Sequence, residues 1–268
     1  MKNTTHTFVV GAVITFLTFA SIYGNSVTGD VIVNTTTNGP VLGEKRAVEN
    51  DEWEYYAFHA IPYASPPVSK LRFKPPQPVK NNRTTAYNAS SSNGKSAKKC
   101  PQKGFAGFSE DITDEDCLYL WVYTPRVSKN ASLLPVLVWI HGGAYEIGSG
   151  SFSDYGPDRF MKGNDIVMVS INYRLGLLGF LSLGNSAVPG NMGLLDQVMA
   201  FKWVKNNIEA FGGNPNMITI MGQSVGSWSV IYHTLSPLSK GLFHRVIAQS
   251  GTPTSFAYHE YTASEAKR

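Results

Sequence analysis

The stretch "MITIMGQSVGSWSVIYH", residues Met217 to His233, decides the fold class of this chain. It opens with a short apolar run typical of a buried strand and closes with a segment that favours a helix. Between them, Ser224 stands between Gly222 and Gly226. A serine on a sharp turn from strand to helix has a strained backbone and a hydroxyl that projects above the sheet, and the glycines leave room for strand and helix to approach. The pattern predicts a nucleophile elbow, although small residues also cluster by chance in ordinary turns.

The chain around this stretch alternates short apolar strands with helices. Runs rich in valine and isoleucine are typical of strands buried on both faces of a mainly parallel sheet. They are "LYLWVY", "PVLVWIH", "DIVMVSIN", "MITIMG" and "FHRVIAQS". The longest helical pattern has apolar residues on one face at Leu194, Val198, Phe201 and Ile208. We predict an α/β fold in one domain over residues 25–268, with flanking helices and a sheet that ends with the strand after the nucleophile helix.

Composition excludes several classes of protein. The 268 residues are 43% hydrophobic and 16% charged, which is typical of a folded globular chain. The net charge of +4 is spread along the chain without a basic block, so we expect no nucleic-acid partner. The acidic stretch from Asp111 to Asp116 lacks the spacing and glycine of a calcium loop, so we expect no metal. Nothing in the sequence calls for a cofactor.

The N-terminus differs from the rest of the chain. Lys2 is followed by the apolar run "FVVGAVITFLTFA" and then by small and polar residues. This order predicts a secretory signal peptide over residues 1–24. The run is shorter than the roughly 18 residues that a membrane span needs, and no later segment reaches that length. A signal anchor is the alternative.

A secreted protein can carry N-linked glycans and disulfides, and the sequence has candidates for both. Asn34, Asn82, Asn88 and Asn130 each begin an Asn-x-Ser/Thr triplet, which predicts N-glycosylation in polar, turn-rich stretches. The two cysteines, Cys100 and Cys117, lie on either side of a short loop. In an oxidising compartment the simplest interpretation is one disulfide, and two free buried thiols are the alternative.

A second glycine-rich turn follows the strand "PVLVWIH". Gly142 and Gly143 can turn their backbone N–H groups toward a pocket because no Cβ stands in the way. The N–H of Val225, at the start of the helix after the serine, is a third donor. Fixed N–H groups of this kind stabilise the oxyanion of an ester under attack. An ordinary glycine turn is the alternative.

Six blocks of the sequence resemble the type-B carboxylesterase and cholinesterase family of α/β-hydrolases, with insect esterases among its members. They occur in the family's order from about Val31 onward: "FHAIPYASPPVSKLRFKPPQPV", "DEDCLYLWVYTP", "VWIHGGAY", "VSINYRLGLLGFLS", "GNMGLLDQVMAFKWVKNNIEAFGGNPNMITIMGQSVG" and "LSPLSKGLFHRVIAQSG". The resemblance implies Ser224 as nucleophile, a disulfide between Cys100 and Cys117, and the named oxyanion donors. It also implies two structural ion pairs, Arg72 with Glu115 and Arg174 with Asp196.

The resemblance covers only the N-terminal half of the family's length. In this fold class the acid and the histidine of the triad follow the serine in that order. After Ser224 the histidines are His233, His244 and His259, and the acids Glu260 and Glu265 come after all of them. No triad in that order exists here, so we expect residues 1–268 to be part of a longer esterase and to show little activity alone.

Three details bear on specificity. Gln223 precedes the serine where many relatives carry Glu, a feature similar to certain insect esterases. Val225 replaces the family's usual alanine. The loop from Cys100 to Cys117 has no tryptophan, which argues against acetylcholine and favours a neutral, apolar ester.

We predict a secreted, glycosylated carboxylic ester hydrolase that works through an acyl-enzyme. The alternative is a non-catalytic, cholinesterase-like adhesion or binding protein.

Overall fold

A computed structural model describes residues 27–48, 51–80, 83–92, 98–102, 113–127 and 131–254. The predicted signal peptide, Asn82 and Asn130 lie outside these residues. Within the described ranges, no helix combines the length and the apolar character needed to cross a bilayer.

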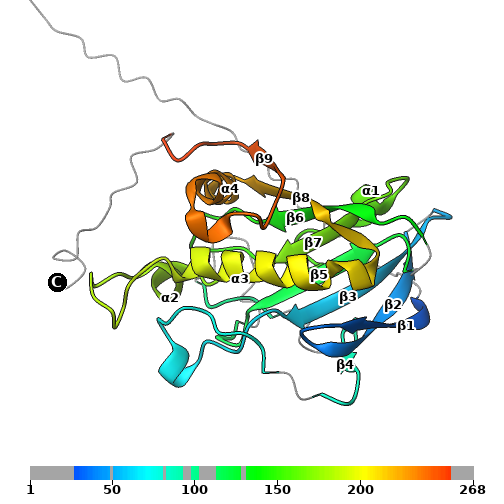
Figure 1. The fold of residues 1–268 in the computed structure, drawn as a ribbon, viewed down its shortest axis with the longest axis horizontal. Coiled ribbons are helices and arrows are strands. Elements are labelled where there is room, and N and C mark those ends of the chain that lie inside the picture. Colours follow the sequence, from blue (N-terminus) through cyan, green and yellow to red (C-terminus); the bar gives the residue numbers. More distant parts are fainter. Residues whose placement is uncertain are drawn as a thin grey trace, which may run out of the picture.

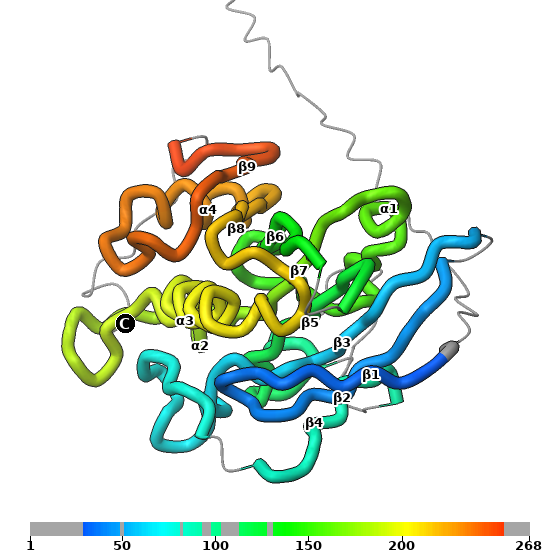
Figure 2. The backbone as a smooth tube through the Cα atoms, turned by 45° about the vertical axis from the view of Figure 1, so that its right-hand side comes forward, coloured from blue at the N-terminus to red at the C-terminus, as the bar shows by residue number. Residues whose placement is uncertain are grey.

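Nine strands form one twisted sheet (Figure 1). Their order across the sheet is β1-β2-β3-β5-β7-β6-β8-β9, and the short strand β4 pairs with β2. The strands are β1 (Val27–Thr35), β2 (Gly39–Ala47), β3 (Glu54–Pro62), β4 (Tyr87–Asn88), β5 (Tyr119–Thr124), β6 (Leu134–Ile140), β7 (Val167–Ile171), β8 (Gly213–Gln223) and β9 (Arg245–Gln249). Figure 2 shows the β1–β2 hairpin and β9 at opposite ends of the sheet.

The predicted α/β fold is confirmed, and the sheet is mixed. Strands β1, β2, β3, β5 and β7 pair in antiparallel fashion, whereas β7, β6, β8 and β9 pair in parallel, as do β2 and β4. Strands β1 and β2 are antiparallel because a tight turn joins them and reverses the chain. The five predicted apolar runs correspond to β5, β6, β7, β8 and β9.

Helices cover the sheet and connect its parallel strands. They are α1 (Asp158–Met161), α2 (Gly176–Phe180), α3 (Met192–Asn207) and α4 (Val225–Leu235). Short 3-10 turns occupy η1 (Ser69–Leu71), η2 (Ile208–Phe211) and η3 (Pro237–Ser239). The long predicted helix is α3, and its last turn tightens into η2.

The core has two layers because alternate residues of a strand point to opposite faces of the sheet. One face carries branched side chains such as Val138 and Val169, which belong to the same buried cluster as Phe201 of α3 and Trp228 of α4. The other face carries larger residues, including Trp121 of β5, in a second cluster. Burial of this kind stabilises the fold by about 25 cal/mol per Å² of apolar surface.

The burial expected for β9 from its apolar run is wrong, whereas its expected place as the strand that ends the sheet is confirmed. Its apolar run predicted a strand buried on both faces, but four of its five residues are exposed and only Val246 is partly buried. Among the described residues, β9 pairs only with β8 and is the edge strand, so fewer neighbouring elements cover its side chains.

Candidate active site

Ser224 lies at the junction of β8 and α4. Strand β8 ends at Gln223 and helix α4 begins at Val225, as the sequence predicts. The backbone of Ser224 has φ 57° and ψ −125°. A positive φ is costly for any residue with a Cβ, so the fold holds this serine in a strained conformation.

The two glycines beside the serine are required by close backbone contacts. A Cβ on Gly222 would lie 2.2 Å from the carbonyl oxygen of Gly226. A Cβ on Gly226 would lie 2.3 Å from the carbonyl oxygen of Ile140, at the end of β6. Strand, turn and neighbouring strand therefore pack more closely than any side chain allows.

The hydroxyl of Ser224 makes no hydrogen bond that would stabilise the described part of the fold. Its Oγ has no hydrogen-bond partner within the described ranges. The backbone N–H of Ser224, by contrast, donates to the carbonyl of Gln249 at 2.9 Å. The main chain is held in place while the side chain is left available.

The glycine loop after β6 lies directly against this serine. Because β6 and β8 are parallel neighbours and Ile140 is paired with Gly222, their carboxyl ends meet at the same edge of the sheet. A Cβ on Gly142 would lie 3.1 Å from the Cβ of Ser224 and 2.7 Å from Oε1 of Gln223. The same Cβ would lie 2.8 Å from the backbone carbonyl oxygen of Gln223, so only glycine fits here without a backbone shift.

The predicted oxyanion donors, the N–H groups of Gly142, Gly143 and Val225, therefore lie near one another and near Ser224. The carbonyl of Gly143 accepts the N–H groups of Glu146 and Ile147 at 2.9 and 3.0 Å, which closes a tight turn. The N–H groups of Gly142 and Gly143 have no partner among the described residues. The N–H of Val225 belongs to the first turn of α4, where backbone donors lack helical partners.

His141 supports this loop with its ring as well as its backbone. The ring is buried and stacks on Tyr173 with centroids 4.4 Å apart. The Tyr173 hydroxyl donates to the carbonyl of His141 at 2.8 Å. Nδ1 lies 2.8 Å from the carbonyl of Gly142, so Nδ1 carries the proton. Burial lowers the pKa of His141 to about 4, and the ring is neutral at neutral pH.

Neither described histidine after the serine reaches it. The buried ring of His233 hydrogen-bonds to Oγ of Ser239 and to Oε1 of Gln197, each at 2.8 Å. Burial lowers the pKa of His233 to about 4. The Nδ1 of His244 accepts the N–H of Ile218 at 3.1 Å. Both rings have structural partners, and within the described ranges no histidine contacts the hydroxyl of Ser224 by a hydrogen bond.

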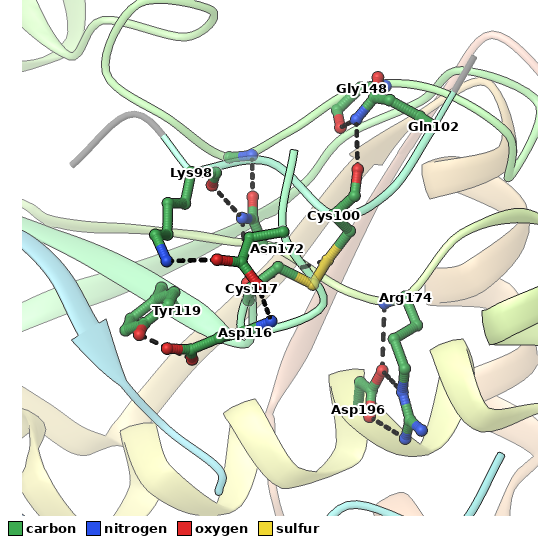
Figure 3. The surroundings of a disulfide bond; sticks show 12 residues. Lys98, Cys100, Gln102, Asp116, Cys117, Tyr119, Gly148, Asn172, Arg174 and Asp196 are labelled. Atoms are coloured by element: carbon green, nitrogen blue, oxygen red, sulfur yellow. Dashed lines mark hydrogen bonds and ion pairs between the residues drawn. A yellow bond between two sulfur atoms is a disulfide. The ribbon is translucent and has the colours of Figure 1, made fainter. Parts of the chain in front are cut away.

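The predicted disulfide and both predicted ion pairs are present, and Figure 3 shows the disulfide and the pair of Arg174 and Asp196. Cys100 and Cys117 are buried and form a disulfide. Arg174 binds Asp196 through two side-chain bonds of 2.8 and 2.7 Å, and both groups are almost completely buried. The pair of Arg72 and Glu115 has bonds of 2.7 and 2.6 Å but lies partly in solvent.

Two of the four predicted glycosylation sites lie within the described ranges. Asn34 and Asn88 are both exposed. They stand in strands β1 and β4 rather than in turns. The Oδ1 of Asn88 accepts the N–H and the hydroxyl of Ser90.

The sheet, the strained serine and the glycine loop define an α/β-hydrolase. Comparison with known families makes this assignment specific: the chain belongs to the carboxylesterase family, whose model matches residues 29–268. The family resemblance expected from the six sequence blocks is thereby confirmed.

Individual relatives are esterases with longer chains. The chain is 46% identical to a carboxylic ester hydrolase of Bombus ignitus over 220 residues, which cover 80% of this chain and 38% of that protein. It is 50% identical to esterase FE4 of Myzus persicae over 205 residues, 74% of this chain and 34% of that protein. A crystal structure of juvenile hormone esterase from Manduca sexta, with OTFP covalently attached, matches with a TM-score of 0.74 at 35% identity and covers 84% of this chain and 41% of that one. The chain thus spans well under half the length of these proteins.

Proposed function

We propose that the protein is a carboxylic ester hydrolase in which Ser224 forms an acyl-enzyme. The observation that carries the proposal is the position of Ser224. Its backbone is strained and fixed to Gln249, its hydroxyl has no partner among the described residues, and Gly142 lies against its Cβ. Strain of this kind is retained where function requires it.

The proposed reaction has two steps. The Oγ of Ser224 attacks the ester carbonyl, and the N–H groups of Gly142, Gly143 and Val225 bind the oxyanion that forms. The alcohol leaves with a proton, and water then attacks the acyl-serine and releases the acid. No metal or cofactor is needed for either step.

The reaction requires a general base for the serine proton. In this fold class the base is a histidine that follows the serine and is oriented by an acid. His233 and His244 are bound to other groups. The proposal therefore places the base and the acid outside the described residues, as expected for part of a longer esterase.

For the substrate we propose a neutral, apolar ester. One relative that is 46% identical over 217 residues is the juvenile hormone esterase of Tribolium castaneum. Gln223, which precedes the nucleophile, lies against Gly142, so this position contacts the glycine loop and can influence substrate choice.

We also propose that the protein is secreted and glycosylated. The apolar N-terminal run, the disulfide and the exposed Asn34 and Asn88 support this proposal. Secreted material should have an N-terminus near residue 25 and should lose mass on treatment with an N-glycosidase. An intact N-terminus in the secreted protein would exclude cleavage of a signal peptide.

A non-catalytic binding protein is the second candidate, because no described histidine hydrogen-bonds to the hydroxyl of Ser224. A binding protein has no need of a strained serine or of a glycine loop pressed against it, and both features favour the enzyme. The two candidates differ in whether the serine is activated.

The experiment is labelling of native protein with a fluorophosphonate probe, which reacts with activated serines. Label should appear in the wild type and disappear in Ser224→Ala. Ser250→Ala is the matched control, because Ser250 is an exposed serine that also has φ 57°. Native protein that is folded but remains unlabelled would refute the proposed mechanism and favour the binding protein.

A further inference from the structure

The loop after β6, residues 141–148, has an unfavourable backbone. Gly143 and Gly148 have φ values of +106° and +110°, and Ala144 and Tyr145 have φ values of 56° and 59°. Residues with a Cβ rarely adopt a positive φ, so contacts from outside the loop must hold this conformation. The loop carries two of the three proposed oxyanion donors.

Gln102 makes one such contact. Its Oε1 accepts the N–H of Gly148 at 2.8 Å, and its Nε2 donates to the carbonyl of the same residue at 2.9 Å (Figure 3). Nε2 also donates to the carbonyl of Cys100 at 3.0 Å. One amide side chain thus forms hydrogen bonds with both the N–H and the carbonyl of Gly148, as the backbone of a neighbouring strand would.

Gly148 lies close to the first residue of the glycine pair. A Cβ on Gly148 would lie 2.5 Å from Nδ1 of His141 and 2.9 Å from the carbonyl oxygen of Gly142. Gly142 in turn lies against Ser224. A continuous series of close contacts therefore runs from Gln102 through Gly148 and Gly142 to the nucleophile.

Gln102 is itself anchored by the disulfide. It stands two residues after Cys100, which is bonded to Cys117 just before β5. Asn172, which follows β7, also links the disulfide region to the segment just after this loop. Its Nδ2 donates to the carbonyls of Lys98 and Cys117 at 3.0 and 3.1 Å, and its Oδ1 accepts the N–H of Gly150 at 2.8 Å.

We propose that Gln102 is a positioning residue for the oxyanion site: it fixes Gly148 and so holds the N–H groups of Gly142 and Gly143 beside Ser224. The proposal rests on the proposed function. Gln102 acts through the loop and does not touch the reacting atoms. Such positioning matters because a displacement of about 1 Å in an active site can lower a rate about 100-fold.

The first measurement is hydrogen exchange, which needs no catalytic activity. In Gln102→Ala, amides of residues 141–150 should exchange at least about 10-fold faster, while α3 keeps its wild-type rate. Gln77→Ala is the matched control, because the exposed Gln77 donates only to the nearby carbonyl of Pro75. Unchanged exchange over 141–150, or an equal rise throughout the protein, would overturn the proposal.

The second measurement separates positioning from general stability. In native protein with Ser224-dependent turnover, Gln102→Ala should lower kcat about 10-fold or more and change KM less than about twofold. Gln102→Glu, which keeps the length and the acceptor but loses the donor, should also lower kcat. Unchanged kcat in both variants would overturn the role in catalysis. If the wild type shows no such turnover, the proposed function fails, and hydrogen exchange alone decides whether Gln102 holds the loop.

Discussion

The N–H of Ser224 donates a hydrogen bond to the carbonyl of Gln249, 2.9 Å away, so the last described strand holds the candidate nucleophile. Ser227, one helical turn later, donates from its hydroxyl to the carbonyl of Gly251. The elbow is thus attached at two points to the end of β9. In the part of the chain that the structure describes, this strand is also the exposed edge of the sheet, so the geometry of the site depends on a strand with mostly exposed side chains.

The exposed edge gives a first prediction. Unpaired strand edges with apolar side chains promote association between chains, and Ile247 of β9 is 43% exposed. When the 268-residue chain is expressed alone, Ile247→Lys should reduce its aggregation, as measured by light scattering. Leu177→Lys, an exposed residue on α2, is the control and should have a smaller effect. A wild-type chain that remains monomeric and melts cooperatively would contradict this expectation.

A second prediction concerns the strain at Ser224. Glycine adopts φ 57° and ψ −125° at little steric cost, whereas alanine and serine adopt this conformation only with strain. Ser224→Gly should therefore raise the free energy of unfolding by about 1 kcal/mol relative to Ser224→Ala, which lacks the hydroxyl but keeps the strain. Urea denaturation of the two variants measures the difference. Equal free energies of unfolding for the two variants would mean that this backbone conformation costs a residue with a Cβ nothing.

The glycines of the elbow give a third prediction. In Gly226→Ala the new Cβ would lie 2.3 Å from the carbonyl oxygen of Ile140, and a backbone atom has nowhere to move. We expect a loss of about 3 kcal/mol in the free energy of unfolding, together with loss of probe labelling at Ser224. Gly29→Ala, with no atom within 4 Å of the new Cβ, should change stability by less than about 0.5 kcal/mol. A fully stable, labelled Gly226→Ala protein would refute the close packing.

The two ion pairs should differ in their contribution to stability. Asp196→Asn leaves Arg174 buried without its carboxylate, which should cost about 3–5 kcal/mol. Glu115→Gln breaks the pair of Glu115 and Arg72 in partly exposed surroundings and should cost less than about 1 kcal/mol. Both values come from denaturant titration at neutral pH. Similar costs for the two variants would contradict the difference in burial.

Stability should fall as the pH is lowered from about 6.5 to about 4. Burial lowers the pKa values of His141 and His233 from 6.5 to about 4, so in this range the unfolded chain binds protons that the folded chain does not. Each histidine contributes up to about 1.4 kcal/mol per pH unit to this loss. The low pKa of Glu44, about 2, adds a similar loss only below its unfolded value of 4.5. His233→Gln should make the slope above pH 4.5 shallower, and an unchanged slope would contradict the assignment.

Local sequence determined much of this protein. The strand, turn and helix of residues 217–233 follow from apolar runs and paired glycines, which act over a few residues and need no tertiary information. The same holds for β6 and its glycine turn. Because parallel strands end at one edge of a sheet, these two local patterns were enough to predict that Gly142 and Ser224 would meet.

The support of the site depends on contacts between residues far apart in the sequence. Gln102 and Gly148 are 46 residues apart, and Asn172 and Cys117 are 55 apart. Contacts at such separations depend on strand register and on the rotamer of one polar side chain, which no local propensity specifies. The exposure of β9 was predicted from its place as the last strand of the sheet, whereas its apolar run alone predicted burial, because such a run has the same sequence pattern in the centre of a sheet as at its edge. Burial is a property of neighbours in space, and the sequence pattern of one strand does not identify them.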